Sequence, residues 1–208
     1  MRFILFVEGE AEERMLPPFL KKWLDARLSQ HVGVKAVLFS GWQSLVKNAP
    51  KKAMMHLNGP NRSDIISVIA LLDLYGPTFY PGDKKTISDR YQWAKKHLEE
   101  KVNHPKFRQF FAVHEIEAWL LSDPGLFPSE IQKAFPGKIQ HPEEVNFDHP
   151  PAKLLDRLYD EKLKRTYKKT TNGYELFNKL DPSLAYSKCP HLKQMLDEML
   201  KLAKAEGL

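Results

Sequence analysis

Four carboxylates follow a short apolar run near the start of the chain. The run covers residues 3–7, and it is followed by Glu8, Glu10, Glu12 and Glu13. Acids this close together repel one another unless a cation or the amide groups at a helix start accept them, and amides alone do so only modestly. Glu8 precedes the turn and is not an ordinary first-turn acid, so it is the first candidate for a functional carboxylate. For Glu10 and Glu13, simple decoration of a helix N-terminus stays an open alternative.

Further acids also come directly after apolar runs. Asp73 follows residues 65–72, and His114, Glu115 and Glu117 follow residues 107–113. His114 is a candidate for proton transfer or for a partner of a metal ligand, although a histidine at a strand end is more often structural. The chain therefore places acids after three of its apolar runs.

Parallel strands are needed to bring these acids together. Unbroken apolar runs predict strands buried on both faces, and helical spacing predicts helices between them. We expect strands over residues 3–7, 34–39, 65–72 and 107–113, and helices from the first acids to about Ser29 and over residues 42–57 and 87–102. Pro17 and Pro18 either start the first helix or kink it. The order predicts an α/β fold with a mostly parallel central sheet flanked by helices.

The carboxyl ends of parallel strands lie at one edge of the sheet, where ligands bind in open α/β folds. Glu8, Asp73 and either Glu115 or Glu117 should therefore meet there. Carboxylate oxygens are ligands for Mg²⁺ or Mn²⁺ rather than for zinc, and the single Cys189 adds no cysteine-based zinc site. Such a site can position and polarise a phosphate ester. The loop over residues 74–83, rich in Pro, Gly and aromatic residues, is either an active-site loop or a structured crossover.

The last third of the chain has a different composition, richer in Pro, Lys and His. We expect one catalytic domain over residues 1–123 and a basic helical C-terminal extension over residues 124–208 that packs on it. The residues expected to bind nucleic-acid phosphates are Lys153, Arg157, Lys164, Arg165, Lys168 and Lys169. Tyr159, Tyr167 and Tyr174 lie among them and could stack on unpaired bases. A solvated helix face is the alternative for this basic stretch, and Lys168 or Lys169 could reach the metal site.

Composition limits the class of protein further. The formal net charge of +6 over 208 residues makes a polyanionic partner plausible but is weak evidence alone. The one cysteine suits a reducing compartment, so we expect a cytoplasmic protein. The apolar start is too short for a signal-peptide core, and no run reaches membrane-spanning length, so no membrane association is expected.

The motif at residues 7–12, Val-Glu-Gly-Glu-Ala-Glu, resembles the first motif of Toprim domains, the catalytic fold of topoisomerases, primases and OLD-type nucleases. Residues 72–76 stand where those domains carry their second acidic motif. More narrowly, residues 73–76, 79–82 and 114–121 resemble the Toprim-like family of unknown function that includes AriB, the effector paired with an ATPase in the PARIS anti-phage system. Tyr75 stands where the usual Asp-x-Asp motif has its second acid, which puts a two-metal site in question.

The resemblance implies a metal-dependent nuclease with Glu8 as the Toprim glutamate, Asp73 as a metal ligand and Glu12 as a supporting acid. Residues two apart project to different sides, so only one of Glu115 and Glu117 should face the site, and we favour Glu117. Lys168 is the basic residue expected to assist. The expected cofactor is Mg²⁺ or Mn²⁺, the substrate is tRNA or DNA, and the partner is an AAA or ABC-type ATPase. A homodimer stays open.

Two other functions compete with this hypothesis. One is a non-catalytic adaptor or sensor module for the ATPase, which Tyr75 keeps open. The other is a phosphotransferase or another phosphate-handling enzyme acting on small compounds. The chain has no Gly-x-x-x-x-Gly-Lys loop, so ATP hydrolysis would come from another protein.

Overall fold

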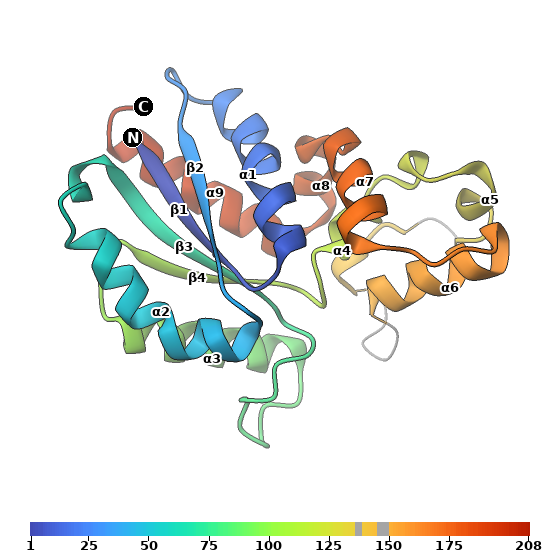
Figure 1. The fold of residues 1–208 in the computed structure, drawn as a ribbon, viewed down its shortest axis with the longest axis horizontal. Helices are drawn as coiled ribbons and strands as arrows, with labels where there is room; N and C mark the ends of the chain where they lie inside the picture. Colours follow the sequence, from blue (N-terminus) through green and yellow to red (C-terminus); the bar gives the residue numbers. More distant parts are fainter. Residues whose placement is uncertain (136–138, 145–149) are drawn as a thin grey trace.

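A parallel β-sheet forms the centre of the computed structural model, which describes residues 1–135, 139–144 and 150–208. Within that part of the chain the sheet has four strands in the order β2-β1-β3-β4, and every neighbouring pair is parallel. The strands are β1 (Arg2–Val7), β2 (Gly33–Leu38), β3 (Ile65–Asp73) and β4 (Phe107–Ala112). Figure 1 shows helices on both sides of this sheet. The predicted α/β fold with a parallel sheet is confirmed.

Helices cover both faces because successive residues of a strand point to opposite sides. In β1, Phe3 and Leu5 join one hydrophobic cluster, whereas Ile4 and Phe6 join the other. The second cluster lies under α2 (Trp42–Leu57) and α3 (Ile87–Val102), whose bounds are those predicted. The first lies under α1 (Glu10–Asp25) and α9 (Pro190–Ala205). A short 3₁₀ turn, η1 (Arg62–Asp64), precedes β3.

The first helix contains both prolines and ends earlier than predicted. Pro17 and Pro18 lie inside α1, on its less buried side, where carbonyl groups that lose a backbone partner can be hydrated. The prediction of a helix to about Ser29 is wrong, since α1 ends at Asp25. The Asp25 carboxylate accepts a hydrogen bond from the Val32 backbone N–H at 3.0 Å, which ties the turn to the start of β2.

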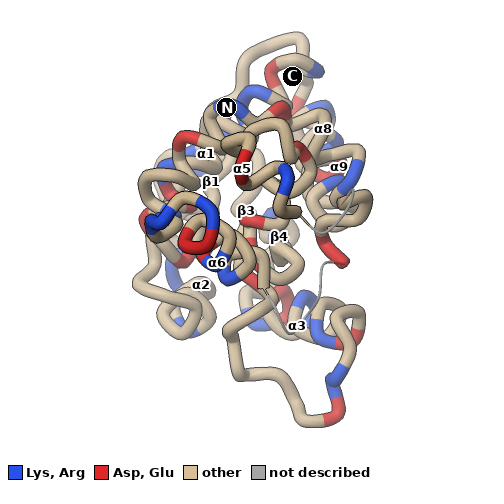
Figure 2. Tube along the Cα trace, turned by 90° about the vertical axis from the view of Figure 1, so that its right-hand side faces the viewer, with Lys and Arg blue, Asp and Glu red and all other residues tan. Residues whose placement is uncertain are grey.

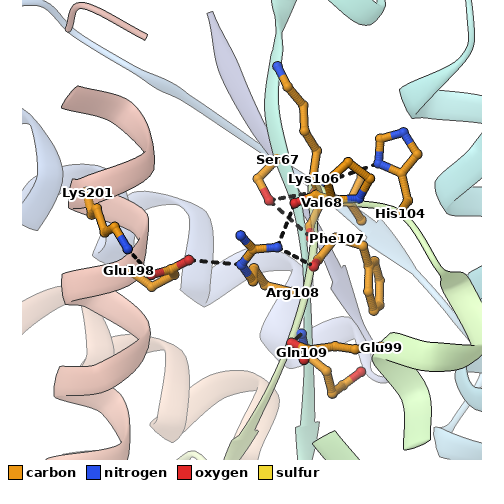
Figure 3. A network of polar contacts seen from close by, with 11 residues as sticks. Ser67, Val68, Glu99, His104, Lys106, Phe107, Arg108, Gln109, Glu198 and Lys201 are labelled. Atoms are coloured by element: carbon orange, nitrogen blue, oxygen red, sulfur yellow. Dashed lines mark hydrogen bonds and ion pairs between the residues drawn. The ribbon is translucent and has the colours of Figure 1, made fainter. Parts of the chain in front are cut away.

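Ion pairs fasten the last helix to the sheet. Arg108 on β4 donates to Glu198 on α9 through Nε at 2.9 Å, and its Nη1 also donates to the Phe107 carbonyl (Figure 3). At the first turn of α9, the buried Glu143 carboxylate accepts hydrogen bonds from the backbone N–H groups of His191 and Leu192 at 2.8 and 3.1 Å. The Arg108 contact joins α9 to the edge strand β4, and the Glu143 contacts join the first turn of α9 to the segment that contains Glu143.

The segment after β4 folds into short helices. They are α4 (Glu117–Leu120), η2 (Pro124–Leu126), α5 (Ser129–Gln132), η3 (Pro142–Glu144), α6 (Pro151–Leu163), the π-helical turn η4 (Lys169–Gly173), α7 (Tyr174–Lys179) and α8 (Pro182–Lys188). Their apolar residues belong to the same cluster as α1 and one face of β1. The division of the chain at residue 123 stays a prediction. None of the described helices has both the length and the apolar character needed to cross a bilayer.

Candidate functional site

Acidic side chains from neighbouring strands meet at the carboxyl edge of the sheet. Glu8 follows β1, Asp73 is the last residue of β3, and Glu117 begins α4 shortly after β4. The backbone N–H of Asp73 donates to Glu8 Oε1 at 3.0 Å, which holds Glu8 across the gap between β1 and β3. Asp73 Oδ1 in turn accepts from the Ile116 backbone N–H at 3.2 Å, which ties β3 to the start of α4. The acids are therefore held by strand order and by backbone hydrogen bonds.

The ammonium group of Lys169 lies between these acids. Its Nζ is 2.6 Å from Glu12 Oε1, 3.3 Å from Glu117 Oε2 and 3.6 Å from Asp73 Oδ2. The π-helical turn η4 places it there, because the Lys168 carbonyl accepts from the N–H groups of Thr171, Asn172 and Gly173. Single π-helical turns are frequent at functional sites. Lys169 joins three carboxylates from α1, β3 and α4 through one positive charge.

Glu12 is fixed by close packing as well as by this ion pair. Its side chain is buried, and a Cβ atom added at Gly9 would lie 2.4 Å from Glu12 Oε2. Glycine at position 9 therefore leaves the space that the Glu12 carboxylate fills.

Burial changes the acidity of the cluster. Burial, with added repulsion from Glu8, Glu12 and Glu117, raises the pKa of Asp73 well above its usual value, against the opposing effect of Lys169. Burial also raises the pKa of Glu8, although the Asp73 N–H opposes this. Burial alone would lower the pKa of Lys169, but Asp73, Glu117 and Glu12 raise it well above its usual value. Lys169 is therefore a permanent cation rather than a proton acceptor.

Glu117 is the most deeply buried of these acids. Neither of its oxygens has a hydrogen-bond partner among the described residues, and burial raises its pKa to about 7 against the effect of Lys169. An acid with a raised pKa binds its proton more tightly in the folded protein than in the unfolded chain. Its contribution to stability is complete below about pH 4.5, the usual pKa, and is lost as the pH rises through about 7.

Replacement of Glu117 by Gln should therefore flatten the pH dependence of stability. In metal-free buffer, the free energy of unfolding of the wild type should fall, relative to that of Glu117→Gln, as the pH rises from about 4.5 to about 7. Urea unfolding at several pH values measures this difference. Glu143, whose pKa burial also raises to about 7, is present in both proteins, so the difference isolates Glu117. Parallel curves for the two proteins would contradict the assignment.

Glu115 and His114 lie beside the cluster in other roles. Glu115 Oε2 accepts a hydrogen bond from the Ala152 backbone N–H at 2.9 Å, in the first turn of α6, so Glu115 fastens α6 to the sheet edge. His114 has φ of 64°, a left-handed backbone conformation at the strand-to-helix turn, and burial lowers the pKa of its ring. The structure places Glu117, not Glu115, against Lys169.

The basic residues of the C-terminal stretch separate into two groups. Lys153, Arg157, Lys164, Arg165 and Lys168 are exposed, and Lys169 is the one that reaches the acids. Along α6 the basic residues share the helix with Asp156, Asp160 and Glu161, and Figure 2 shows both Lys or Arg and Asp or Glu positions at this helix. The prediction that Tyr159 and Tyr167 stack on bases is wrong, because both rings are buried and packed on each other with centroids 5.3 Å apart.

Sequence reasoning did not identify the support behind Lys169. The Tyr167 ring is buried behind η4, and a Cβ atom at Gly173 would lie 2.9 Å from its hydroxyl oxygen. A larger residue at position 173 would therefore displace the Tyr167 hydroxyl. The only signal in the sequence is a Gly preceded by two threonines and an asparagine, which indicates a turn but not its target.

The donor set of the cluster fits a divalent metal in its chemistry. The buried oxygens of Glu117, without hydrogen-bond partners, and those of Glu8 and Asp73 are hard ligands of the kind that Mg²⁺ and Mn²⁺ prefer. Among the described residues no group of three or more His, Cys, Asp or Glu is already arranged around a metal position. The Lys169 ammonium neutralises the acids instead, so metal binding would require its side chain to shift.

Comparison with known families gives one assignment. The model of a family described as Domain of unknown function (DUF4276) matches residues 7–200. The chain belongs to the DUF4276 family. The matched range contains every acid of the cluster and Lys169, so the site lies within the part of the chain that defines the DUF4276 family. A search of curated proteins finds no match.

Two solved structures resemble the chain over nearly its whole length. The C-terminal region of the Burkholderia pseudomallei OLD protein is 20% identical with a TM-score of 0.48, covering 98% of this chain and 98% of that chain. The C-terminal region of the Xanthomonas campestris pv. campestris OLD protein is 16% identical with a TM-score of 0.43, covering 100% of this chain and 97% of that chain.

Proposed function

We propose that the chain is a divalent-metal-dependent endonuclease that hydrolyses phosphodiester bonds of tRNA or DNA. The observation that carries the proposal is the convergence of carboxylates from α1, β3 and α4, those of Glu12, Asp73 and Glu117, around the Lys169 ammonium group. Buried acids with raised pKa values are costly to fold and are concentrated at functional sites. The motifs that resemble Toprim nucleases contain the same acids.

Each member of the cluster has a distinct role in this proposal. Glu8, Asp73 and Glu117 would hold Mg²⁺ or Mn²⁺, which when bound supplies polarisation of the phosphate ester and an activated water. Lys169 stays protonated and stabilises negative charge on the phosphate oxygens. Glu12 positions Lys169 through the 2.6 Å ion pair.

The exposed basic residues after Ala152 supply the affinity for nucleic acid. Lys153, Arg157, Lys164, Arg165 and Lys168 neutralise backbone phosphates, so binding should weaken as salt rises. Lys168 lies beside Lys169 in sequence but is exposed, so its role is substrate contact at the edge of the site.

Control by another protein completes the proposal. By its resemblance to the family that includes AriB, the chain would act in the cytoplasm as the effector of an anti-phage system, held inactive by an AAA or ABC-type ATPase. The chain has no phosphate loop of its own to bind ATP, which is consistent with a separate ATPase.

A cleavage assay tests this function directly. Purified protein, alone and with its ATPase, is incubated with total tRNA and with plasmid DNA in Mg²⁺, Mn²⁺ or EDTA. We expect discrete cleavage products with either metal and none in EDTA. Turnover of small phosphate compounds without nucleic-acid cleavage would favour a phosphotransferase, and the absence of all turnover would contradict the proposal.

Lys169 also favours a second candidate function. Its ammonium compensates the acids without any metal, and Tyr75 stands where a further acid would be expected. Both features suit a non-catalytic adaptor or sensor of the ATPase. Isothermal titration with Mn²⁺ separates the two functions. For the nuclease, the wild type should release or absorb heat on binding Mn²⁺, and Asp73→Asn should lose this heat. For the adaptor, the wild type and Asp73→Asn should give the same titration.

A further inference from the structure

A cavity opens in the loop between β3 and α3, which begins directly after Asp73. Its volume is about 450 Å³, within the range of small-ligand sites. The residues that line it are Tyr75, Gly76, Pro77, Thr78, Tyr80, Pro81, Gly82, Lys84, Lys85 and Arg90. The loop that forms most of it extends away from the sheet and helices (Figure 1). We call it the loop pocket.

The loop pocket combines positive charge with aromatic rings. Lys84, Lys85 and Arg90 line it, and no acid is among its lining residues. The nearest acid in sequence, Asp83, is 69% exposed in its side chain and pairs with Lys84 at 2.6 Å. Tyr75 supplies a planar surface on the same wall, whereas the Tyr80 ring is stacked on Phe79 and has the Arg90 guanidinium carbon 5.2 Å from its centre. Cations beside aromatic rings suit a ligand that carries both a phosphate and a planar base.

Aromatic stacking and hydrogen bonds hold the loop in shape. The Phe79 ring stacks on Tyr80 with ring centroids 4.7 Å apart. It also contacts the rings of Trp42 and Trp93. Arg90 on α3 donates through Nε to the Lys84 carbonyl at 3.0 Å. A pocket formed before binding loses less entropy when a ligand enters.

The loop pocket is linked directly to the acid cluster. The Tyr80 hydroxyl donates to the Leu74 carbonyl at 3.0 Å, one residue after Asp73. Gly76 has φ of 102°, which turns the chain from the strand end into the pocket wall. On the other side, Lys153 Nζ lies 5.9 Å from the centre of the Tyr75 ring. Tyr75 therefore lies between the loop pocket and the basic residues of α6.

We propose that the loop pocket binds one unpaired nucleotide of a single-stranded nucleic acid, with the base against Tyr75 and a phosphate on Lys84 and Lys85. The proposal rests on the proposed nuclease function, because the strand would continue from the pocket past Asp73 to Lys153. An unpaired base is required, since a base inside a duplex does not expose a face for tyrosine to stack on. Tyr75 would thus serve in binding at a position where an acid was expected.

Binding without cleavage tests this site. The full-length protein in EDTA is titrated against fluorescein-labelled single-stranded RNA, single-stranded DNA, the matching duplexes and a mononucleotide, with anisotropy as the readout. We expect single strands to bind at least about tenfold more tightly than duplexes, as for sites that stack unpaired bases. The RNA and DNA arms identify the sugar, and the mononucleotide arm shows whether the strand is needed.

Substitutions then locate the binding. Lys85→Glu should weaken single-strand binding about tenfold at low salt and lower the slope of log affinity against log salt by about 1. Tyr75→Leu should weaken binding about tenfold, whereas Tyr75→Phe should retain it, because the ring and not the hydroxyl stacks. Lys204→Glu on α9 makes the same charge change at an exposed residue near the chain terminus, at the opposite end of the molecule from the loop (Figures 1 and 2), and should bind as the wild type.

The outcomes separate the loop pocket from the nuclease function. If Lys85→Glu and Lys204→Glu weaken binding equally, the site is overturned while cleavage by the wild type can still be observed. If Lys85→Glu alone weakens binding but the wild type cuts nothing in Mg²⁺ or Mn²⁺, the site stands and the nuclease function fails. Equal binding of duplexes and single strands, or mononucleotide binding as tight as that of the strand, would also overturn the proposal.

Discussion

Asp73→Asn is expected to lower the rate of nucleic-acid cleavage by about 100-fold to 1000-fold, the range seen when one charge-stabilising group is removed from an active site. Asp73 connects several parts of the site. Its backbone N–H donates to Glu8, its carboxylate accepts from the Ile116 N–H, and its Oδ2 lies 3.6 Å from Lys169 Nζ. Asparagine keeps an oxygen for the Ile116 N–H but removes the negative charge. The loss should therefore be chemical rather than structural.

Stability should not fall with activity in this variant. The pKa of Asp73 is raised well above its usual value, chiefly by burial, which means that its charged form is disfavoured in the folded protein. Loss of that charge should leave the melting temperature at neutral pH unchanged or higher. An inactive protein with a melting temperature at or above that of the wild type is the expected combination.

The measurement is a time course of cleavage with differential scanning calorimetry on the same samples. Glu8→Gln should behave as Asp73→Asn does, since Glu8 also has a raised pKa and accepts the Asp73 N–H. Glu10→Gln is the matched control, because Glu10 is exposed on the first turn of α1, two residues after Glu8. Cleavage by Asp73→Asn at the wild-type rate would rule out the metal-ligand role.

The sheet was predictable because its strands carry their own signal. Residues 65–72 form an unbroken apolar run, and such runs separated by helical patterns leave few alternatives to a parallel sheet. That topology alone brings Glu8 and Asp73 to one edge, without any knowledge of side-chain contacts. The strands and the acids that follow them can thus be located from local sequence patterns, whereas the strand order β2-β1-β3-β4 comes from the structure.

The rest of the site depends on contacts that no local pattern contains. Lys169 is one of several lysines in a basic stretch, and the π-helical turn that begins with it, where Gly173 passes close to Tyr167, directs it to the acids instead of solvent. Glu115 differs from Glu117 because the first turn of α6 supplies a backbone N–H for it, 37 residues away in sequence. Tyr159 and Tyr167 were misjudged because aromatic rings within a charged stretch can face either the core or solvent.

Lys169→Met is expected to lower the free energy of unfolding by about 3 kcal/mol. This value is at the low end for loss of one partner of a buried ion pair, because 30% of the lysine side chain is exposed. Methionine fills a similar space but leaves the carboxylates of Glu12, Asp73 and Glu117 without a compensating charge. Urea unfolding at pH values above neutral measures the loss. It should shrink as the pH falls toward about 5, because the raised pKa of Glu117, about 7, allows protonation there.

Lys168→Met is the matched control, since Lys168 is the preceding residue and is exposed. It should change the free energy of unfolding by less than about 0.5 kcal/mol, as surface substitutions usually do. A stable Lys169→Met protein would show that the acids do not depend on this ammonium for their charge compensation.

Divalent metal should restore much of the stability lost in Lys169→Met. If Glu8, Asp73 and Glu117 form a metal site, removal of the ammonium frees it, and Mn²⁺ should raise the melting temperature of the variant more than that of the wild type, because a ligand that binds only the folded state stabilises it. Asp73→Asn added to Lys169→Met should abolish this effect. If Mn²⁺ does not stabilise Lys169→Met, the adaptor is favoured over the nuclease. The acids of the wild type would then serve only to bind the Lys169 ammonium group.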